Sequence, residues 1–132
     1  MDLNRTELIG RLVKDPVSRK LSNGQKVTTF DLATNYSWQD IKTKEKKETV
    51  DFHSVVFWGR TAGVVEKYLK KGSRIFMSGR LVYRTWEDKT GTKKYKTEII
   101  GSDLIMIDSK NRNLKKEELT EENITIEEVP VD

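Results

Sequence analysis

The spacing of apolar side chains changes twice along the chain, and this change limits the folds that the chain can adopt. Between residues 50 and 58, side chains alternate with the period of two that a β-strand imposes. One face of this expected strand carries Val50, Phe52, Ser54, Val56 and Trp58, and the other carries Asp51, His53, Val55 and Phe57. Between residues 61 and 71 the period becomes helical, and Gly72 follows as a stop signal. The helical stripe consists of Val64, Val65, Tyr68 and Leu69.

Strand-like segments lie on both sides of this helix. They are separated by turn signals, of which Asp15-Pro16 and Ser22-Asn23-Gly24 are the clearest, and by a polar, lysine-rich loop over residues 40–48. Three strands, one helix and two strands, in that order, are the layout of the five-stranded Greek-key barrel called the OB-fold. We therefore predict an all-β fold with one helix, and its strands are expected at 8–13, 27–36, 50–58, 74–86 and 95–107.

Charge divides the chain into two parts. Residues 1–109 carry 21 Lys+Arg and 14 Asp+Glu, a net charge of +7, whereas residues 110–132 carry 4 and 7, a net charge of −3. The segment from Glu117 to Asp132 contains seven acidic residues, no basic residue and no aromatic residue, so it has little to bury. We predict a folded domain over 1–109 that binds an anionic partner, followed by a short, flexible, acidic tail over 110–132.

Several classes of protein are disfavoured by what the sequence lacks. Cysteine is absent, which removes disulfides and thiolate metal sites, and no apolar run approaches the roughly 20 residues of a membrane span. The charged N-terminus does not resemble a signal peptide, so we expect a soluble protein of the cytoplasm. Asp51 and His53 share a strand face, but two ligands do not make a metal site and no catalytic motif is present. We predict no enzyme activity, no cofactor and no metal.

Flat aromatic side chains are interleaved with cations in the basic part of the chain. Single-stranded nucleic acids expose base faces that stack on aromatic rings and phosphates that attract Lys and Arg. Phe30, Phe57, Phe76 and Tyr68 are assigned to the core, because aromatic residues on strands are more often buried. The candidate stacking residues are Trp38, Phe52, Trp58 and Trp86, and the candidate phosphate-binding residues are Arg5, Arg11, Lys14, Arg60, Lys70, Lys71, Arg74, Arg80 and Arg84.

Short segments of a familiar pattern occur in order over residues 3–108. They are Asn4-Arg5, Leu8-Ile9-Gly10-Arg11-Leu12, Asp15-Pro16, Phe30-Asp31-Leu32-Ala33-Thr34, Ser37-Trp38, Phe52-His53-Ser54-Val55-Val56-Phe57-Trp58-Gly59, Tyr68-Leu69-Lys70-Lys71-Gly72-Ser73, Gly79-Arg80-Leu81 and Arg84-Thr85-Trp86. In these segments the chain resembles bacterial single-stranded DNA-binding proteins. The resemblance implies an OB-fold that wraps single-stranded DNA with little sequence preference. It also implies stacking by Trp38, Phe52, Trp58 and Trp86, assembly as a homotetramer, and a place for His53 at the subunit interface.

The end of the chain departs from the family pattern. Family members often end in acidic residues, Ile-Pro and a terminal Phe that recruits replication and repair proteins, whereas this chain ends in Glu127, Glu128, Val129, Pro130, Val131 and Asp132. The acidic tail is retained as the candidate partner-binding segment, without an aromatic anchor. Three alternatives stay open: a primosome-type OB-fold adaptor with weak DNA binding, a cold-shock-like RNA-binding protein, and a small hydrolase or nuclease that uses Asp51 and His53.

Overall fold

The computed structural model describes residues 1–107 of the chain. The predicted tail over 110–132, with its candidate partner-binding residues 127–132, and the predicted boundary at residue 109 lie outside this part. Residues 1–107 form six strands and one helix: β1 (Thr6–Leu12), β2 (Val17–Lys20), β3 (Lys26–Gln39), β4 (Lys46–Trp58), α1 (Gly59–Tyr68), β5 (Arg74–Glu87) and β6 (Lys93–Met106).

Five of these strands close into a barrel in the order β1-β3-β4-β6-β5. Closure depends on β1, which pairs antiparallel with β5 over most of its length and then with β3 at its end. Strands β4 and β6 pair in parallel, with Val55 opposite Ile99. The helix falls between β4 and β5, after the third strand of the barrel. This topology confirms the predicted OB-fold, an all-β barrel with one helix.

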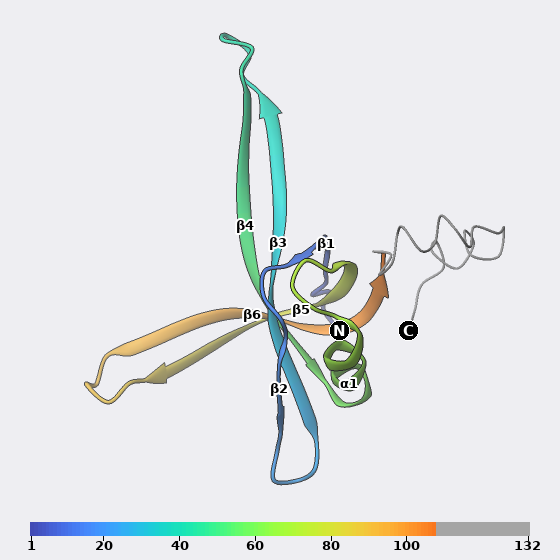
Figure 1. The fold of residues 1–132 in the computed structure, drawn as a ribbon. Coiled ribbons are helices and arrows are strands. Elements are labelled where there is room, and N and C mark those ends of the chain that lie inside the picture. The colour runs from blue at the N-terminus through green and yellow to red at the C-terminus, as the bar shows by residue number, and fades with distance from the viewer. Residues whose placement is uncertain (108–132) are drawn as a thin grey trace, which may run out of the picture.

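Three hairpins radiate from the barrel, as Figure 1 shows. They are β2–β3, β3–β4 and β5–β6, and the outer parts of the two longer ones extend well beyond the barrel as two-stranded arms. Strand β4 begins at Lys46, so part of the predicted 40–48 loop is strand. The β2 strand was not predicted, because Val17-Ser18-Arg19-Lys20 has only one apolar residue and no alternation. It forms through its pairing with β3 across the turn at Asn23-Gly24.

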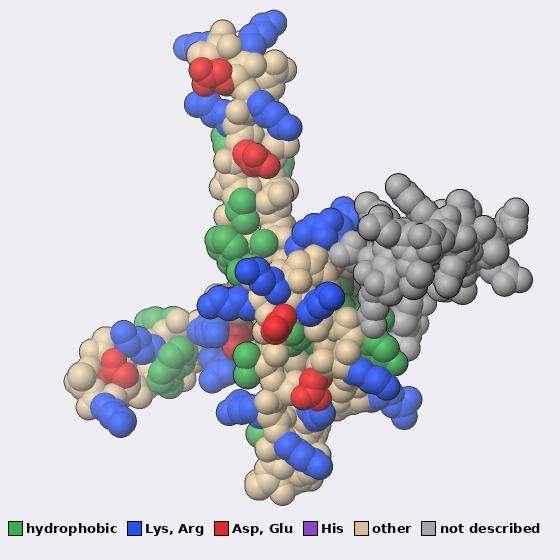
Figure 2. Space-filling model, viewed as in Figure 1, with side chains coloured by type: hydrophobic (Ala, Val, Ile, Leu, Met, Phe, Trp, Pro, Cys, Tyr) green, Lys and Arg blue, Asp and Glu red, His purple; other side chains and the backbone are tan. Residues whose placement is uncertain are grey.

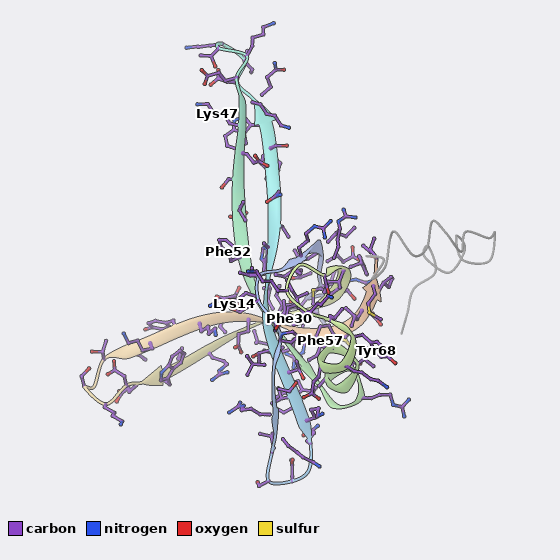
Figure 3. The ribbon with its side chains drawn as sticks, in the orientation of Figure 1. Lys14, Phe30, Lys47, Phe52, Phe57 and Tyr68 are labelled. Carbon is purple, nitrogen blue, oxygen red and sulfur yellow. The ribbon has the colours of Figure 1, made fainter. Side chains whose placement is uncertain are left out.

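The core fills the barrel and the space under the helix. Phe57 from β4 and Ile75 from β5 are fully buried, and α1 adds Ala62 and Val65 from one face. The rings of Phe30 and Phe57 lie 6.1 Å apart, as predicted for core aromatics (Figure 3). This burial is the main source of stability that a small barrel has.

The assignment of Tyr68 to the core is wrong, because Tyr68 is 39% exposed. The helix ends at Tyr68 instead of continuing to residue 71, since Leu69 takes extended backbone angles and its N–H bonds to the Val65 carbonyl. Leu69 turns into the core, while the Tyr68 ring lies on the surface beside the Lys67 ammonium. Phe76 is only half-buried, since it points away from the face that carries Ile75 and Met77.

Candidate nucleic-acid interface

An open groove of about 400 Å³ lies on the outside of the barrel beside Trp58. It forms because Val56 and Trp58 point outward from β4, while Phe57 between them points into the core. Aliphatic side chains of β3, β4, β5 and β6 line it, together with polar side chains of β2, β3, β5 and β6. The lining residues are Arg19, Val27, Thr29, Val56, Trp58, Val82, Arg84, Glu98 and Ile100.

Aromatic rings and cations meet at this groove. Trp58 is 40% exposed and Trp86 is 43% exposed, so both rings have an accessible surface. The Arg84 guanidinium lies 5.9 Å from the centre of the Trp86 ring, within cation–π range. Arg84 also lines the groove beside Trp58 and therefore links the two rings. Three predicted site residues, Trp58, Arg84 and Trp86, are thus brought together on one face.

The other two predicted stacking residues lie on the β3–β4 arm. Phe52 pairs with Ala33, and Trp38 pairs with Lys47. Because residues 47 and 52 are separated by an odd number of positions on β4, Trp38 and Phe52 project from opposite faces of the arm. Phe52 is on the same strand face as Trp58 and is exposed at the foot of the arm (Figure 3). The four aromatic residues therefore do not form one flat platform within a single chain.

The predicted phosphate-binding cations fall into separate groups. Arg11 and Arg74 are opposite each other where β1 meets β5, and Arg11 Nη1 donates to the Gly72 carbonyl at 2.8 Å. Lys14, Lys70 and Lys71 belong to exposed turns, and the Lys71 backbone N–H donates to Asp15. Arg80 is on the groove face of β5. Arg5 pairs with Glu7 at 3.1 Å, and Arg60 is exposed at the start of α1.

Side chains of Lys and Arg gather around the place where the arms meet, and fewer acidic side chains are visible there (Figure 2). The acidic side chains on the same view are scattered. This distribution fits an anionic ligand that passes over the junction of the arms.

His53 has a structural partner. Its Nε2 lies 2.9 Å from the Thr34 hydroxyl on the neighbouring strand, and the residue is half-buried. Asp51, two positions before His53, is exposed. Across residues 1–107, no three His, Asp or Glu side chains are grouped as metal ligands. The geometry favours an oriented structural histidine over a catalytic pair.

An aspartate orders the tip of each long arm. Asp40 Oδ1 accepts backbone N–H groups from Lys42 at 2.8 Å and Thr43 at 3.1 Å. Asp88 Oδ1 accepts the Thr90 hydroxyl at 2.6 Å and the Thr92 N–H at 2.9 Å. These bonds favour the ionised forms. The Thr43 and Lys42 N–H groups lower the pKa of Asp40, and the Thr90 hydroxyl with the Thr92 N–H lowers the pKa of Asp88.

Acid is expected to loosen the tips of both arms only when the pH falls below the ordinary pKa of an aspartate. A carboxyl whose pKa is lowered on folding contributes stability above its unfolded pKa of about 3.9, and that contribution is lost as pH falls through the folded value. An NMR acid titration that follows the Thr43 and Thr92 amides should therefore give midpoints below about 3.9. Midpoints at or above that value would show that the bonds do not form in solution.

Four residues that lie beside the candidate binding residues were not among the predicted site residues. Tyr36 stacks on Trp38 with ring centres 5.8 Å apart, which the spacing of two positions on one strand already permits. Arg19 lines the groove with Trp58, but it belongs to strand β2. Because β2 was not predicted, nothing in the sequence indicated that Arg19 would lie near Trp58. Lys96 and Glu98 lie beside Arg84 because of the register in which β5 pairs with β6. A single sequence does not reveal this register.

A five-stranded OB barrel with an aromatic, cation-lined groove on its outer face defines the class of nucleic-acid-binding OB proteins. The pattern of the Single-strand binding protein family matches residues 3–107. This chain belongs to that family, which confirms the resemblance seen in its sequence. Among residues 1–107, no helix has the length and apolar character needed to cross a membrane.

Relatives and a solved structure agree with this assignment. The chain is 42% identical over 113 residues to Single-stranded DNA-binding protein 1 of Xylella fastidiosa, covering 86% of this chain and 83% of the relative. It is 42% identical over 110 residues to Single-stranded DNA-binding protein 1 of Chlorobaculum tepidum, covering 83% of this chain and 67% of the relative. The fold matches the Plasmodium falciparum SSB in its complex with ssDNA, with a TM-score of 0.75 and 39% identity. That match covers 82% of this chain and 97% of the other.

Proposed function

We propose that this protein binds single-stranded DNA without strong sequence preference and protects it during replication, recombination and repair. The observation that carries the proposal is the groove lined by Trp58 and Arg84, together with the Trp86 ring that lies within cation–π range of the same Arg84 guanidinium. The protein acts by binding and catalyses no reaction. The family match does not favour the alternative of a primosome-type adaptor.

Binding combines long-range electrostatic attraction of the phosphates with short-range stacking of the bases. Cations around the junction of the arms attract the phosphates, and this attraction weakens as salt rises. Stacking on aromatic rings then holds the bases, with about 1–3 kcal/mol for each base stacked. Because every base has a π-face, stacking tolerates any sequence. Trp38, Phe52, Trp58 and Trp86 are the proposed stacking residues, and the strand passes around the β3–β4 arm to reach both of its faces.

Oligo-dT is expected to quench the tryptophan fluorescence of the full chain strongly at low salt, since all three tryptophans are proposed stacking residues. Added NaCl should reverse the quenching, and a double-stranded oligonucleotide of the same length should quench far less. The oligo-dT should remain intact after long incubation with Mg²⁺, because the protein acts without hydrolysis. An unchanged fluorescence at low salt would overturn the proposed function.

The proposal extends to assembly and partners. We infer a homotetramer with His53 near a subunit interface, supported by the family resemblance and by exposed apolar side chains such as Ile9 on β1. Light scattering of the full chain tests this, and the mass of a monomer would contradict it. The protein is proposed to work on nucleoid DNA in the cytoplasm. Residues 127–132 are the proposed contact for replication and repair proteins, and deletion of these residues should abolish any such contact in a pull-down.

A further inference from the structure

A carboxylate lies on the face where DNA phosphates are proposed to bind. Glu98 of β6 lines the Trp58 groove, and its side chain is only 8% exposed. A buried carboxylate is costly to desolvate, and it repels a polyanion unless cations neutralise it. Its presence in this groove therefore requires a compensating arrangement.

Two cations neutralise this carboxylate, one at each oxygen. Arg84 Nη1 lies 3.3 Å from Glu98 Oε1, and Lys96 Nζ lies 3.8 Å from Glu98 Oε2. Arg84 comes from β5, and Lys96 is two positions before Glu98 on β6. All three side chains lie on the face of the β5–β6 arm that also carries Trp86.

The positions of Arg84 and Lys96 bring two positive charges close together. Arg84 and Lys96 are directly opposite each other in the antiparallel ladder, and like charges in that position destabilise a strand pair. Glu98 offsets the repulsion because it attracts both. The three side chains together carry two positive charges and one negative charge, a net charge of +1.

Both cations keep groups available for a further anion. The Arg84 side chain is 62% exposed and the Lys96 side chain is 49% exposed, while the carboxylate between them is covered. A guanidinium has five N–H donors, and only one of the terminal nitrogens of Arg84 contacts Glu98. An oxyanion that approaches from solvent therefore meets cationic donors and not the carboxylate.

We propose that Arg84 and Lys96 form a single phosphate-binding site for the backbone of single-stranded DNA, and that Glu98 is its positioning residue. The site takes one phosphodiester group, beside the base that stacks on Trp86. This inference rests on the proposed function and deepens it, because it adds Lys96 and Glu98 to the binding face and assigns them one shared ligand.

The charge balance of the three side chains makes the proposal testable. Lys96→Gln leaves Arg84 and Glu98 with no net charge, so one phosphate contact is lost. The slope of log K against log[NaCl] for oligo-dT binding by the full chain should then become shallower by about 0.7. Lys96→Gln combined with Glu98→Gln restores a net charge of +1, and the slope should return toward the wild-type value.

Matched controls lie on the opposite face of the same arm. Lys93 and Glu87 form a cross-strand pair there. Lys93→Gln should leave the slope unchanged, and Glu87→Gln added to Lys96→Gln should not restore it. Equal slopes for Lys96→Gln and the wild type, or restoration by Glu87→Gln, would overturn the proposal. If a thermal melt shows that the variant with Glu98→Gln does not fold, the salt slopes of Lys96→Gln and Lys93→Gln still test the proposal. Absence of any wild-type binding would instead overturn the proposed function.

Discussion

Trp58→Ala is expected to weaken oligo-dT binding by about 5- to 150-fold, which corresponds to the loss of about 1–3 kcal/mol of base stacking. The ring lines the groove together with Arg19 and Arg84, so its removal takes away the aromatic surface while the cations remain. The affinity should therefore fall without a change in salt dependence. Anisotropy of a labelled oligo-dT measures this without relying on tryptophan emission.

Tyr83→Ala is the matched control for this variant. Tyr83 is also an exposed aromatic residue on a strand, but it points away from the face that carries Arg84 and Trp86. Its removal should leave the affinity within about twofold of the wild type, since no stacking energy is lost. If Trp58→Ala bound as tightly as Tyr83→Ala, the groove would not be a site of base stacking.

Gly101→Ala is expected to lower the free energy of unfolding by about 1–3 kcal/mol, as is typical of overpacked cores. A Cβ at this position would overlap three carbons of the fully buried Phe57 ring. The closed barrel leaves the ring little space to move. Urea unfolding measures the change, with all variants at one protein concentration so that the proposed assembly would affect them equally.

Gly63→Ala is the control, because a Cβ at Gly63 meets open space and the residue lies within α1. This variant should be more stable than the wild type by about 0.5–1 kcal/mol. Phe57→Leu should reduce the cost of Gly101→Ala when the two are combined, since a smaller side chain leaves room for the methyl group. A fully additive double variant would show that the Phe57 ring is not the cause.

The fold was largely predictable because its strands are half-buried. Strict alternation in residues 50–58 predicted that Trp58 and Phe57 lie on opposite faces of the strand, and Phe57 is buried in the core as predicted. The helix was also predicted, although its end differs because Leu69 leaves helical geometry to reach the core. Strand β2 was missed because its formation depends on the neighbouring strand and not on its own apolar pattern.

The candidate site was less predictable than the fold. Arg84 and Trp86 are two positions apart on one strand, so alternation alone is enough to place them on the same face, where the guanidinium lies 5.9 Å from the ring centre. To predict which side chains lie side by side on neighbouring strands, one must know the pairing register, and the register is determined by the whole barrel. This is why the opposite faces of Trp38 and Phe52, the pairing of Arg84 with Lys96, and the buried position of Glu98 emerged only from the structure.

The placement of Trp38 and Phe52 on opposite faces of the β3–β4 arm has a consequence for how bound DNA would leave. A strand that contacts both faces cannot detach in one movement, because it must release one face before the other. Each release breaks only the stacking of a few bases, at about 1–3 kcal/mol per base. If DNA binds as proposed, the strand would therefore leave from one end in small steps, each with a lower barrier than release of the whole strand at once.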